Sequence, residues 1–352
     1  MQALYTTREA VLRSFEIANT TRISPMVDNE IRAASESVDH QLHRFFTVEK
    51  ITLAFDWPNY QHADAWRIYF NEQSFITIDT VVSGGLTLDP ADYLPYRADG
   101  VLAPPYEYIE INRARSAAFS SGLSPQRSIM FSGLTGVQDL TSSGGVLTPG
   151  MDATTSIAFI DPVNGRMYVG VGSSLIIGNE RLQVTERGWS DSGTVLLTSL
   201  GSIQSDNIVE MSDTTKVALY EYLHIGGESV QVLSIVGSNV TVRRAVNGSV
   251  LATHESGCPI YLNNAFSVTR GAFGTSAAVH AGSAPVLIQR YPAQVEQLSL
   301  AEAVVGVAQN AGLYARIVGQ GSSTREAVGK GLDDMRRAAY QSWGRKLRKT
   351  AI

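Results

Sequence analysis

The sequence predicts an α+β protein in which a helical domain, built from both chain ends, carries an inserted all-β domain, a small barrel or sandwich with internal repeats. Apolar residues recur every three or four positions near both termini, as on one face of a helix. The middle of the chain shows a period of two, and the whole chain contains 31 glycines, which is typical of turn-rich strands. Two internal repeats indicate reused β units. We expect residues 1–131 and 291–352 to form the helical domain and residues 132–290 the inserted one.

The N-terminal segment carries two helix signals. Thr6 and Glu9 match a capping box, in which a hydroxyl and a carboxylate each bind a backbone N–H at a helix start, so a short helix through Ile17 should follow. Ser24 as N-cap and Pro25 at the first helical position then begin a longer helix. Its apolar stripe consists of Ile31, Ala34, Val38, Leu42 and Phe45. This stripe should pack inside the helical domain.

From Ile51 the period changes to two. "ITLAFDW" and "WRIYF" alternate, and "SFITIDTVVSGGLTL" predicts two strands around a Ser83-Gly84-Gly85 turn. The prolines of "DPADYLPYRADGVLAPPY" predict a loop, and "YEYIEI" is a further strand. We assign these short strands to the helical domain.

Two more helices are expected after the β-rich middle. Ser299 and Glu302 form a second capping box, and "GQGSS" interrupts the helix that they begin. Thr324 begins the last helix. Its apolar positions are Val328, Leu332, Met335 and Ala339.

The middle of the chain contains two repeats with different offsets. "VRRAVNGSVLATH" recurs as "VTRGAFGTSAAVH" 26 residues later (His254 to His280), and "LHIGGESVQV" follows "LIIGNERLQV" by 48 residues (Leu175 to Leu223). The first repeat pairs Arg244 with Arg270, Gly248 with Gly274 and His254 with His280; the second pairs Glu180 with Glu228. Duplicated β-hairpin units explain both repeats, whereas the irregular offsets argue against a long solenoid.

We expect the repeated residues to be structural. Arg243, Arg244 and Arg270 are assigned to structural salt bridges, with the repeated Glu180 and Glu228 as partners, rather than to phosphate or carboxylate binding. His254 and His280 should stabilise turns by hydrogen bonds from the imidazole to the backbone, with Gly248 and Gly274 at positive φ. A metal site through the two histidines is disfavoured, because Glu255 and Cys258 occur in the first copy only.

No catalytic or cofactor motif stands out. HExxH, GxSxG and a strand-to-helix GxGxxG do not occur, and "GQGSST" at residues 319–324 lacks the lysine of a phosphate loop, so it should connect two helices. Nothing in the sequence orients Cys258 and His254 as a nucleophile and base, so a packed free cysteine is expected. We therefore expect no enzyme, no cofactor, no metal and no catalytic residue.

Composition limits partners and compartment. The net charge of −5 gives no general attraction for nucleic acid or anionic membranes. One cysteine excludes an intramolecular disulfide and favours folding in a reducing cytoplasm. No stretch approaches the roughly 20 apolar residues of a membrane span, and "MQALYTTREAV" does not look like an export signal, so a soluble protein is expected.

A basic cluster near the C-terminus runs against the acidic balance of the chain. No acidic residue occurs between Arg336 and Lys349, and Trp343 and Leu347 are candidate anchors. The cations are Arg336, Arg337, Arg345, Lys346, Arg348 and Lys349. Two interpretations remain open: a solvated helix end with cations near the negative end of the dipole, or a docking element for an acidic partner or DNA.

The helical opening "VDNEIRAASESVDHQLHRFF", the strands "ITLAFDW" and "WRIYF", and the closing helix pair resemble the head-to-tail adaptor, or connector, proteins of long-tailed double-stranded DNA bacteriophages. In that family the N-terminal helical segment ends in an Arg-Phe-Phe-like stretch, here Arg44, Phe45 and Phe46. The resemblance covers about residues 1–130 and 291–352. "VTRGAFGTSAAVH" also resembles a turn motif in β domains of phage virion proteins.

The resemblance implies a structural virion protein whose helical part is an adaptor domain. The implied assembly is a homo-oligomeric ring, a dodecamer, in the neck between head and tail, put together in the host cytoplasm. The implied partners are the portal protein, a tail-side neck or tail terminator protein, and double-stranded DNA that passes without sequence specificity; no membrane is involved. The basic C-terminus would meet the portal or DNA.

Two other classes remain as alternatives. A carbohydrate-binding or adhesion module of a virion surface or tail protein is second, because duplicated β units with scattered Tyr and Trp are common there, and exposed Trp and Tyr gathered in one groove of the insert would favour it. An enzyme is third.

Overall fold

The computed structural model describes residues 2–15, 23–58, 66–71, 73–310 and 323–345, with backbone alone for 323–330. Strands account for 38% of the chain and helices for 19%, and the strands form large antiparallel sheets. The expected helical adaptor domain with an inserted domain is therefore wrong. The physical reason is that residues 49–135, which we assigned to that domain, form two sheets around a core of their own.

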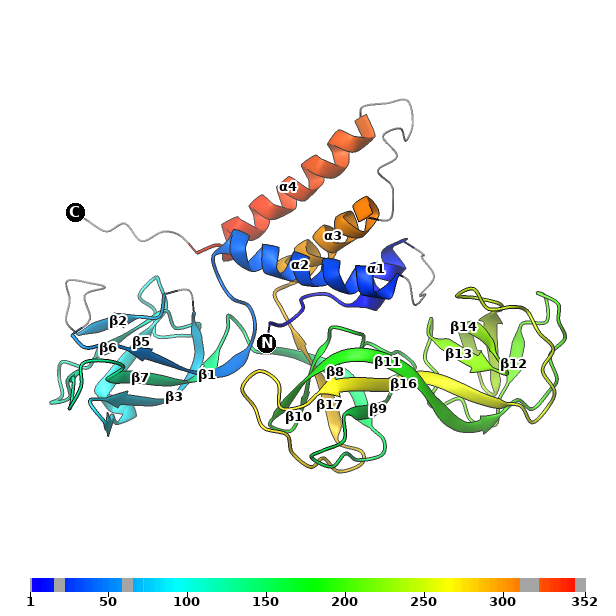
Figure 1. Cartoon of the computed structure of the whole chain (residues 1–352), viewed down its shortest axis with the longest axis horizontal. Coiled ribbons are helices and arrows are strands. Elements are labelled where there is room, and N and C mark those ends of the chain that lie inside the picture. Colours follow the sequence, from blue (N-terminus) through cyan, green and yellow to red (C-terminus); the bar gives the residue numbers. More distant parts are fainter. Residues whose placement is uncertain (1, 16–22, 59–65, 72, 311–322, 346–352) are drawn as a thin grey trace.

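The helices form one layer above the β units (Figure 1). Helix α2 (Ser24–Leu42) packs on α3 (Ala293–Asn310). Helix α4 (Ser323–Trp343) and the short helix α1 (Arg8–Phe15) pack beside them. Their contacts bury Val27, Ile31, Val38, Leu42, Val295, Leu298, Ala303 and Val307. The stripe expected on α2 thus packs inside the helical layer, except for Phe45, which lies beyond the helix end and is exposed.

Three helix boundaries differ from the expected ones. Helix α2 begins at Ser24 itself and Ile23 is its N-cap, so the expected Ser24 cap is wrong. Thr7 rather than Thr6 accepts the N–H of Ala10 at the start of α1. Helix α3 begins at Ala293, after Pro292, so the Ser299 capping box is wrong: Ser299 is buried in the helix interior. Side-chain patterns alone do not distinguish a cap from an interior serine, because the backbone around it decides which N–H groups are free.

Residues 49–135 form the N-terminal β unit. One sheet has the order β1-β7-β3-β4 and the other has the order β2-β6-β5. The strands are β1 (Glu49–Phe55), β2 (Arg67–Tyr69), β3 (Phe75–Ser83), β4 (Leu86–Thr87), β5 (Tyr93–Tyr96), β6 (Tyr108–Ile111) and β7 (Ile129–Thr135), with a 3-10 turn at Pro90–Asp92. The expected turn between β3 and β4 is confirmed, since Gly84 and Gly85 adopt φ of 58° and 89°.

Residues 140–290 form two β modules in a sheet of ten strands. The strands are β8 (Leu140–Leu147), β9 (Ile157–Asp161), β10 (Ser174–Ile177), β11 (Glu180–Val195), β12 (Ile208–Glu210), β13 (Tyr222–Ile225), β14 (Glu228–Val236), β15 (Asn239–Arg243), β16 (Pro259–Thr269) and β17 (Pro285–Arg290). Strands β11 and β16 run through both modules (Figure 1).

Each module has its own core. The first module contains β8, β9, β10 and β17 with residues 180–188 and 264–269, around Leu147, Leu175, Val184, Phe266 and Val286. The second contains β12 to β15 with residues 189–195 and 259–263, around Leu196, Val209, Leu223, Val240 and Ile260. Two cores along one pair of strands make each module a packing unit.

The repeats occupy equivalent positions in the two modules. Leu175 pairs with Ile288 in the first, and Leu223 pairs with Leu262 in the second, which reproduces both offsets. The β14–β15 hairpin turns at Gly237-Ser238 in the second module. At the corresponding place in the first module, β11 and β16 continue into the second module. The second module is thus inserted in a hairpin of the first, which explains why the two offsets differ.

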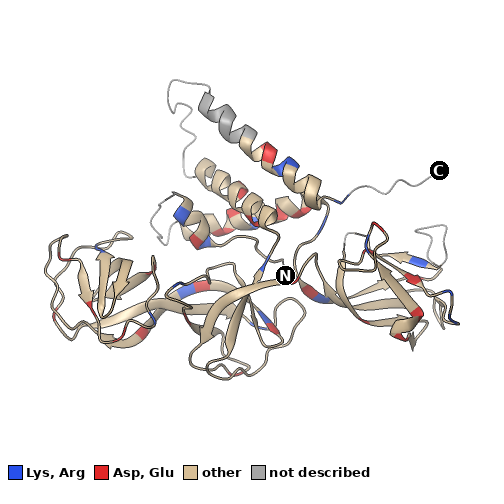
Figure 2. Cartoon of the chain, turned by 180° about the vertical axis from the view of Figure 1, so that it is seen from behind, with Lys and Arg blue, Asp and Glu red and all other residues tan. Residues whose placement is uncertain are grey.

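Charged side chains are sparse on the modules. Figure 2 shows basic and acidic residues close together along the helical layer, while most of the ribbon of both modules carries neither. Charged residues make up 17% of the whole chain, and fewer of them lie on the modules than along the helical layer.

Candidate functional site

Each β module contains a buried Glu–Arg–His cluster at its repeated positions. In the second module Arg244 donates to both carboxylate oxygens of Glu228 at 2.8 and 2.7 Å, and His254 Nε2 lies 2.9 Å from the same carboxylate. In the first module Arg270 donates to Glu180 at 2.7 and 2.8 Å, and His280 Nε2 lies 2.7 Å from it. The expected Arg–Glu salt bridges are confirmed.

The remaining donors of both arginines hold loops together. Arg244 donates to the carbonyls of Gly201, Asp206 and Ala252. Arg270 does the same to the carbonyls of Asp152, Thr155 and Ala278. Every charge in these clusters is therefore paired and hydrogen-bonded, which is the condition under which a buried ion pair is tolerated.

The environment keeps both carboxylates ionised. Burial opposes ionisation of Glu228, but hydrogen bonds from Arg244, His254 and the N–H groups of Ala245 and Ala252 lower its pKa to about 2. The pKa of Glu180 is likewise lowered to about 2, against burial, by Arg270 and by its backbone and histidine partners. Neither carboxylate is therefore available as a proton carrier near neutral pH.

The histidine prediction needs one correction. Each imidazole bonds to the carboxylate of its glutamate instead of to the backbone, because the Glu oxygens point into the turn. The backbones of His254 and His280 form bridges with Leu200 and Met151. Gly248 and Gly274 adopt φ of 78° and 75°, which confirms the expected positive φ.

The residues considered for a metal or a nucleophile are used otherwise. Among the residues that the structure describes, no three His, Cys, Asp or Glu side chains are grouped so as to hold a metal ion. Cys258 packs against the core of the second module. Both repeated histidines are committed to their glutamates.

A set of ion pairs joins α1 to both modules, and we call it the α1 junction. Arg8, whose side chain is 4% exposed, pairs with Asp28 of α2 and Glu186 of β11. Arg187 pairs with Glu221 at 2.6 Å, Arg13 reaches the same carboxylate at 3.1 Å, and Glu9 accepts the N–H of Val171. The sequence carries no signal for this junction, because its partners are far apart along the chain.

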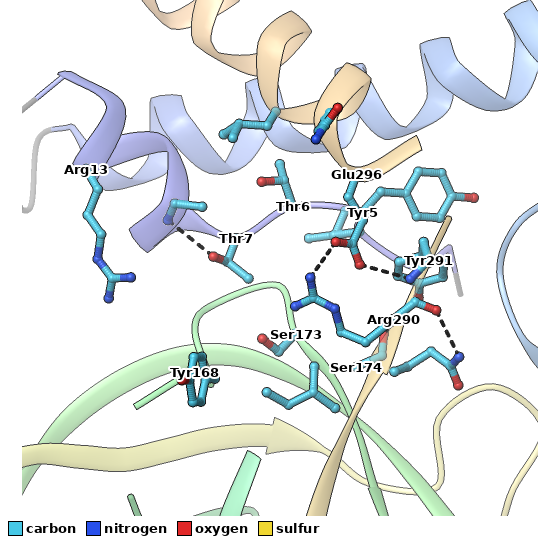
Figure 3. A pocket seen from close by; sticks show the side chains of 16 residues that line it. Tyr5, Thr6, Thr7, Arg13, Tyr168, Ser173, Ser174, Arg290, Tyr291 and Glu296 are labelled. Atoms are coloured by element: carbon cyan, nitrogen blue, oxygen red, sulfur yellow. Dashed lines mark hydrogen bonds and ion pairs between the residues drawn. The ribbon is translucent and has the colours of Figure 1, made fainter. Parts of the chain in front are cut away.

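Figure 3 shows a cleft of about 320 Å³ between the N-terminal segment, the end of β17 and α3. Arg290 pairs with Glu296, which also accepts the N–H of Tyr291. Ser173 accepts the N–H of Gly170, and Ser174 bonds to Gln183. Neither serine of the cleft is paired with a histidine or carboxylate that would activate it, so the cleft shows no nucleophile and base.

The basic C-terminal cluster is partly used inside the fold. Arg336 pairs with Glu302 at 2.8 Å and with Asp333, Arg337 pairs with Asp334, and Arg345 lies 3.7 Å from the buried Glu107. Trp343 packs on the core between the helices and the first module. Acidic partners from outside the segment pair with these three arginines, so part of the cluster contacts the rest of the fold, while docking by the segment stays a prediction.

Some sequence features lie outside the described residues. Lys346, Leu347, Arg348 and Lys349 belong to this group, as do residues 319–322 of "GQGSST", while Ser323 and Thr324 begin α4. The docking role of the last cations stays a prediction. None of the helices that the structure describes is long and apolar enough to cross a membrane.

No protein-family model, no curated protein and no solved structure matches this chain.

Proposed function

We propose that the protein is a structural subunit of a virion that joins neighbouring proteins in the neck between head and tail. The observation that carries this proposal is the use of the strongest polar clusters: both Glu–Arg–His clusters and the α1 junction fasten segments of the chain to one another. Active sites hold perturbed groups that are poised to react. In these clusters the buried charges are paired with one another and hold segments of the chain together.

Continuity between the two modules supports the same proposal. Strand β11 spans 16 residues and β16 spans 11, and both contribute to the cores of the two modules without a loop between them, although their register shifts where the modules meet, between Gly188 and Ser190. Two paired strands resist bending more than a flexible linker does. A subunit of a closed ring needs such fixed geometry, because heterologous contacts close only at one rotation per subunit.

The residues that resemble phage adaptors lie where the helical layer meets the N-terminal β unit. Phe46 is 1% exposed in the core beside α2, and Arg44 binds Glu107 at 2.5 Å. A homo-oligomeric ring, contact with the portal and a tail-side protein, and passage of double-stranded DNA are parts of the proposal. The charge of −5 per subunit suits a channel that must not hold DNA firmly.

Electron microscopy tests the proposal directly. The purified chain is imaged alone and after mixing with portal-bearing heads, and particles from phage that lack the gene are imaged in parallel. We expect rings at the portal vertex and, without the gene, DNA-filled heads that lack tails. Tailed particles of normal yield in the absence of the chain would refute the neck assignment.

A further inference from the structure

The second module has an outward row of side chains that crosses four strands. Cross-strand pairing places Ser229 of β14 beside His224 of β13, His224 beside Tyr261 of β16, and Tyr261 beside Asp191 of β11. The residues that alternate with them, such as Leu223, Val230, Ile260 and Leu262, fill the core. The row therefore lies on the outer face of the module, and three strand spacings make it about 14 Å long.

Trp189 extends this row. Its side chain is 41% exposed, and its ring centroid lies 5.2 Å from that of His224, with 36° between the ring planes. Trp189 and Asp191 are both exposed on either side of Ser190, which pairs with the core residue Leu262, so both project from the outer face. We call Trp189, Asp191, His224, Ser229 and Tyr261 the aromatic row.

The first module shows that the fold does not require these residue types. The equivalent cross-strand row there consists of Arg181, Ile176, Leu287 and Ser143. The position equivalent to Trp189 is Thr141. Arg181 of that row is buried and bonds Gln289 and Asp139, so the shared strand pairing does not by itself require aromatic side chains at the second site.

The chemistry of the aromatic row selects the ligand. An indole face that is partly open offers an apolar surface to the C–H face of a sugar ring, as aromatic side chains do in binding sites with a few polar groups around them. The exposed Asp191 carboxylate accepts the N–H of Gly193 at Oδ1 and can accept a hydroxyl proton at Oδ2, and Tyr261 and Ser229 can both donate and accept. Asp191 repels anionic ligands, which disfavours nucleic acid and acidic polymers.

We propose that the aromatic row of the second module binds a neutral carbohydrate chain of a few sugar units. Trp189 stacks on one sugar ring, and Asp191, His224, Ser229 and Tyr261 bind hydroxyl groups along the row. This site does not depend on the neck assignment, since a virion subunit and a free adhesion module would use it in the same way.

Binding is tested with the full chain. Neutral gluco-, manno-, galacto- and chito-oligosaccharides are titrated by calorimetry, and hydrogen exchange is followed in residues 187–193 and 259–263. At least one oligosaccharide should bind and protect both segments. Trp189→Ala should weaken binding about tenfold or more, and Tyr261→Phe should weaken it less.

Thr141→Ala is the matched control, because Thr141 is exposed at the equivalent position of the first module, and its affinity should equal that of the wild type. If Trp189→Ala does not fold, Trp189→Phe and the exchange protection of the wild type carry the test. Absence of binding at millimolar concentrations by every oligosaccharide would overturn the proposal. Unchanged affinity in a folded Trp189 variant would also overturn it. A folded Trp189 variant that loses self-association of the chain and not sugar binding would overturn it as well. None of these results bears on the electron-microscopy test.

Discussion

Replacing Glu228 by Gln should selectively weaken the second module. The substitution keeps the size of the side chain but leaves the Arg244 guanidinium, whose side chain is 0% exposed, without its counter-charge. Breaking a buried pair by removing one partner costs about 3–5 kcal/mol. The pKa gives a second figure: a native value of about 2 against an ordinary 4.5 corresponds to roughly 3 kcal/mol at neutral pH.

Hydrogen exchange with mass spectrometry measures this effect module by module. In Glu228→Gln, amides of β13, β14 and β15 should exchange faster while those of β10 and β17 stay protected, because the two modules have separate cores. The matched variant Glu180→Gln should accelerate exchange in both modules, because the strands that enter the second module begin in the first.

Acid provides an independent check on the same cluster. A carboxylate whose native pKa is depressed stabilises the fold above its unfolded pKa, and this stability is lost as the pH falls from about 4.5 towards 2. Glu228→Gln should lack this part of the acid sensitivity of the second module. A loss of less than about 1 kcal/mol at neutral pH, or equal loss of protection in both modules, would refute the assignment of Glu228 as the buried counter-charge of one module.

Three further predictions concern the helical layer and its contacts. Burial raises the pKa of Asp39, which accepts the Tyr5 hydroxyl, to about 6. Between about pH 6 and 3.8 the Asp39 carboxyl is protonated in the native state and ionised in the unfolded state, so the free energy of unfolding should rise by up to about 3 kcal/mol as the pH falls through this window. Urea titrations at several pH values should show this dependence in the wild type and not in Asp39→Asn. Gly274 has a φ of +75°, and the Cβ of Gly274→Ala would lie 1.9 Å from the Lys50 carbonyl oxygen. This substitution should therefore lower the free energy of unfolding by more than about 2 kcal/mol and speed hydrogen exchange in β1. An unchanged melting temperature would show that the contact yields without strain. A chain that ends at Tyr340 lacks Trp343 and Arg345, so its free energy of unfolding should be about 2 kcal/mol lower. A chain that ends at Arg345 is the control and should have the melting temperature of the full chain. Equal melting temperatures of the two shortened chains would contradict a packing role for Trp343.

Features that depend on neighbouring residues or on the repeats were predictable from the sequence. The Gly84-Gly85 turn, positive φ at Gly248 and Gly274, and salt bridges between the repeated arginines and glutamates all belong to this group. Turn conformations are local, and a residue repeated in step with its partner indicates that the two act together. The same reasoning failed at Ser299, where a capping pattern occurs inside a helix.

The candidate site was predictable only in kind. Exposed Trp and Tyr on the β insert were named as the mark of carbohydrate binding, but Trp189, His224 and Tyr261 come from three strands that are separated in sequence. No period along one strand shows which strand will lie beside it, because the ladder is made by hydrogen bonds between distant segments.

The sequence by itself determined that two copies of one β unit exist and which charged residues hold each copy together. Only the tertiary structure decided that the second copy is inserted in a hairpin of the first, that residues 49–135 build their own sheets, and that Arg345 lies beside the buried Glu107. Propensity and spacing act over a few residues, whereas sheet pairing, core membership and the pairing of buried charges depend on which distant segments exclude water together.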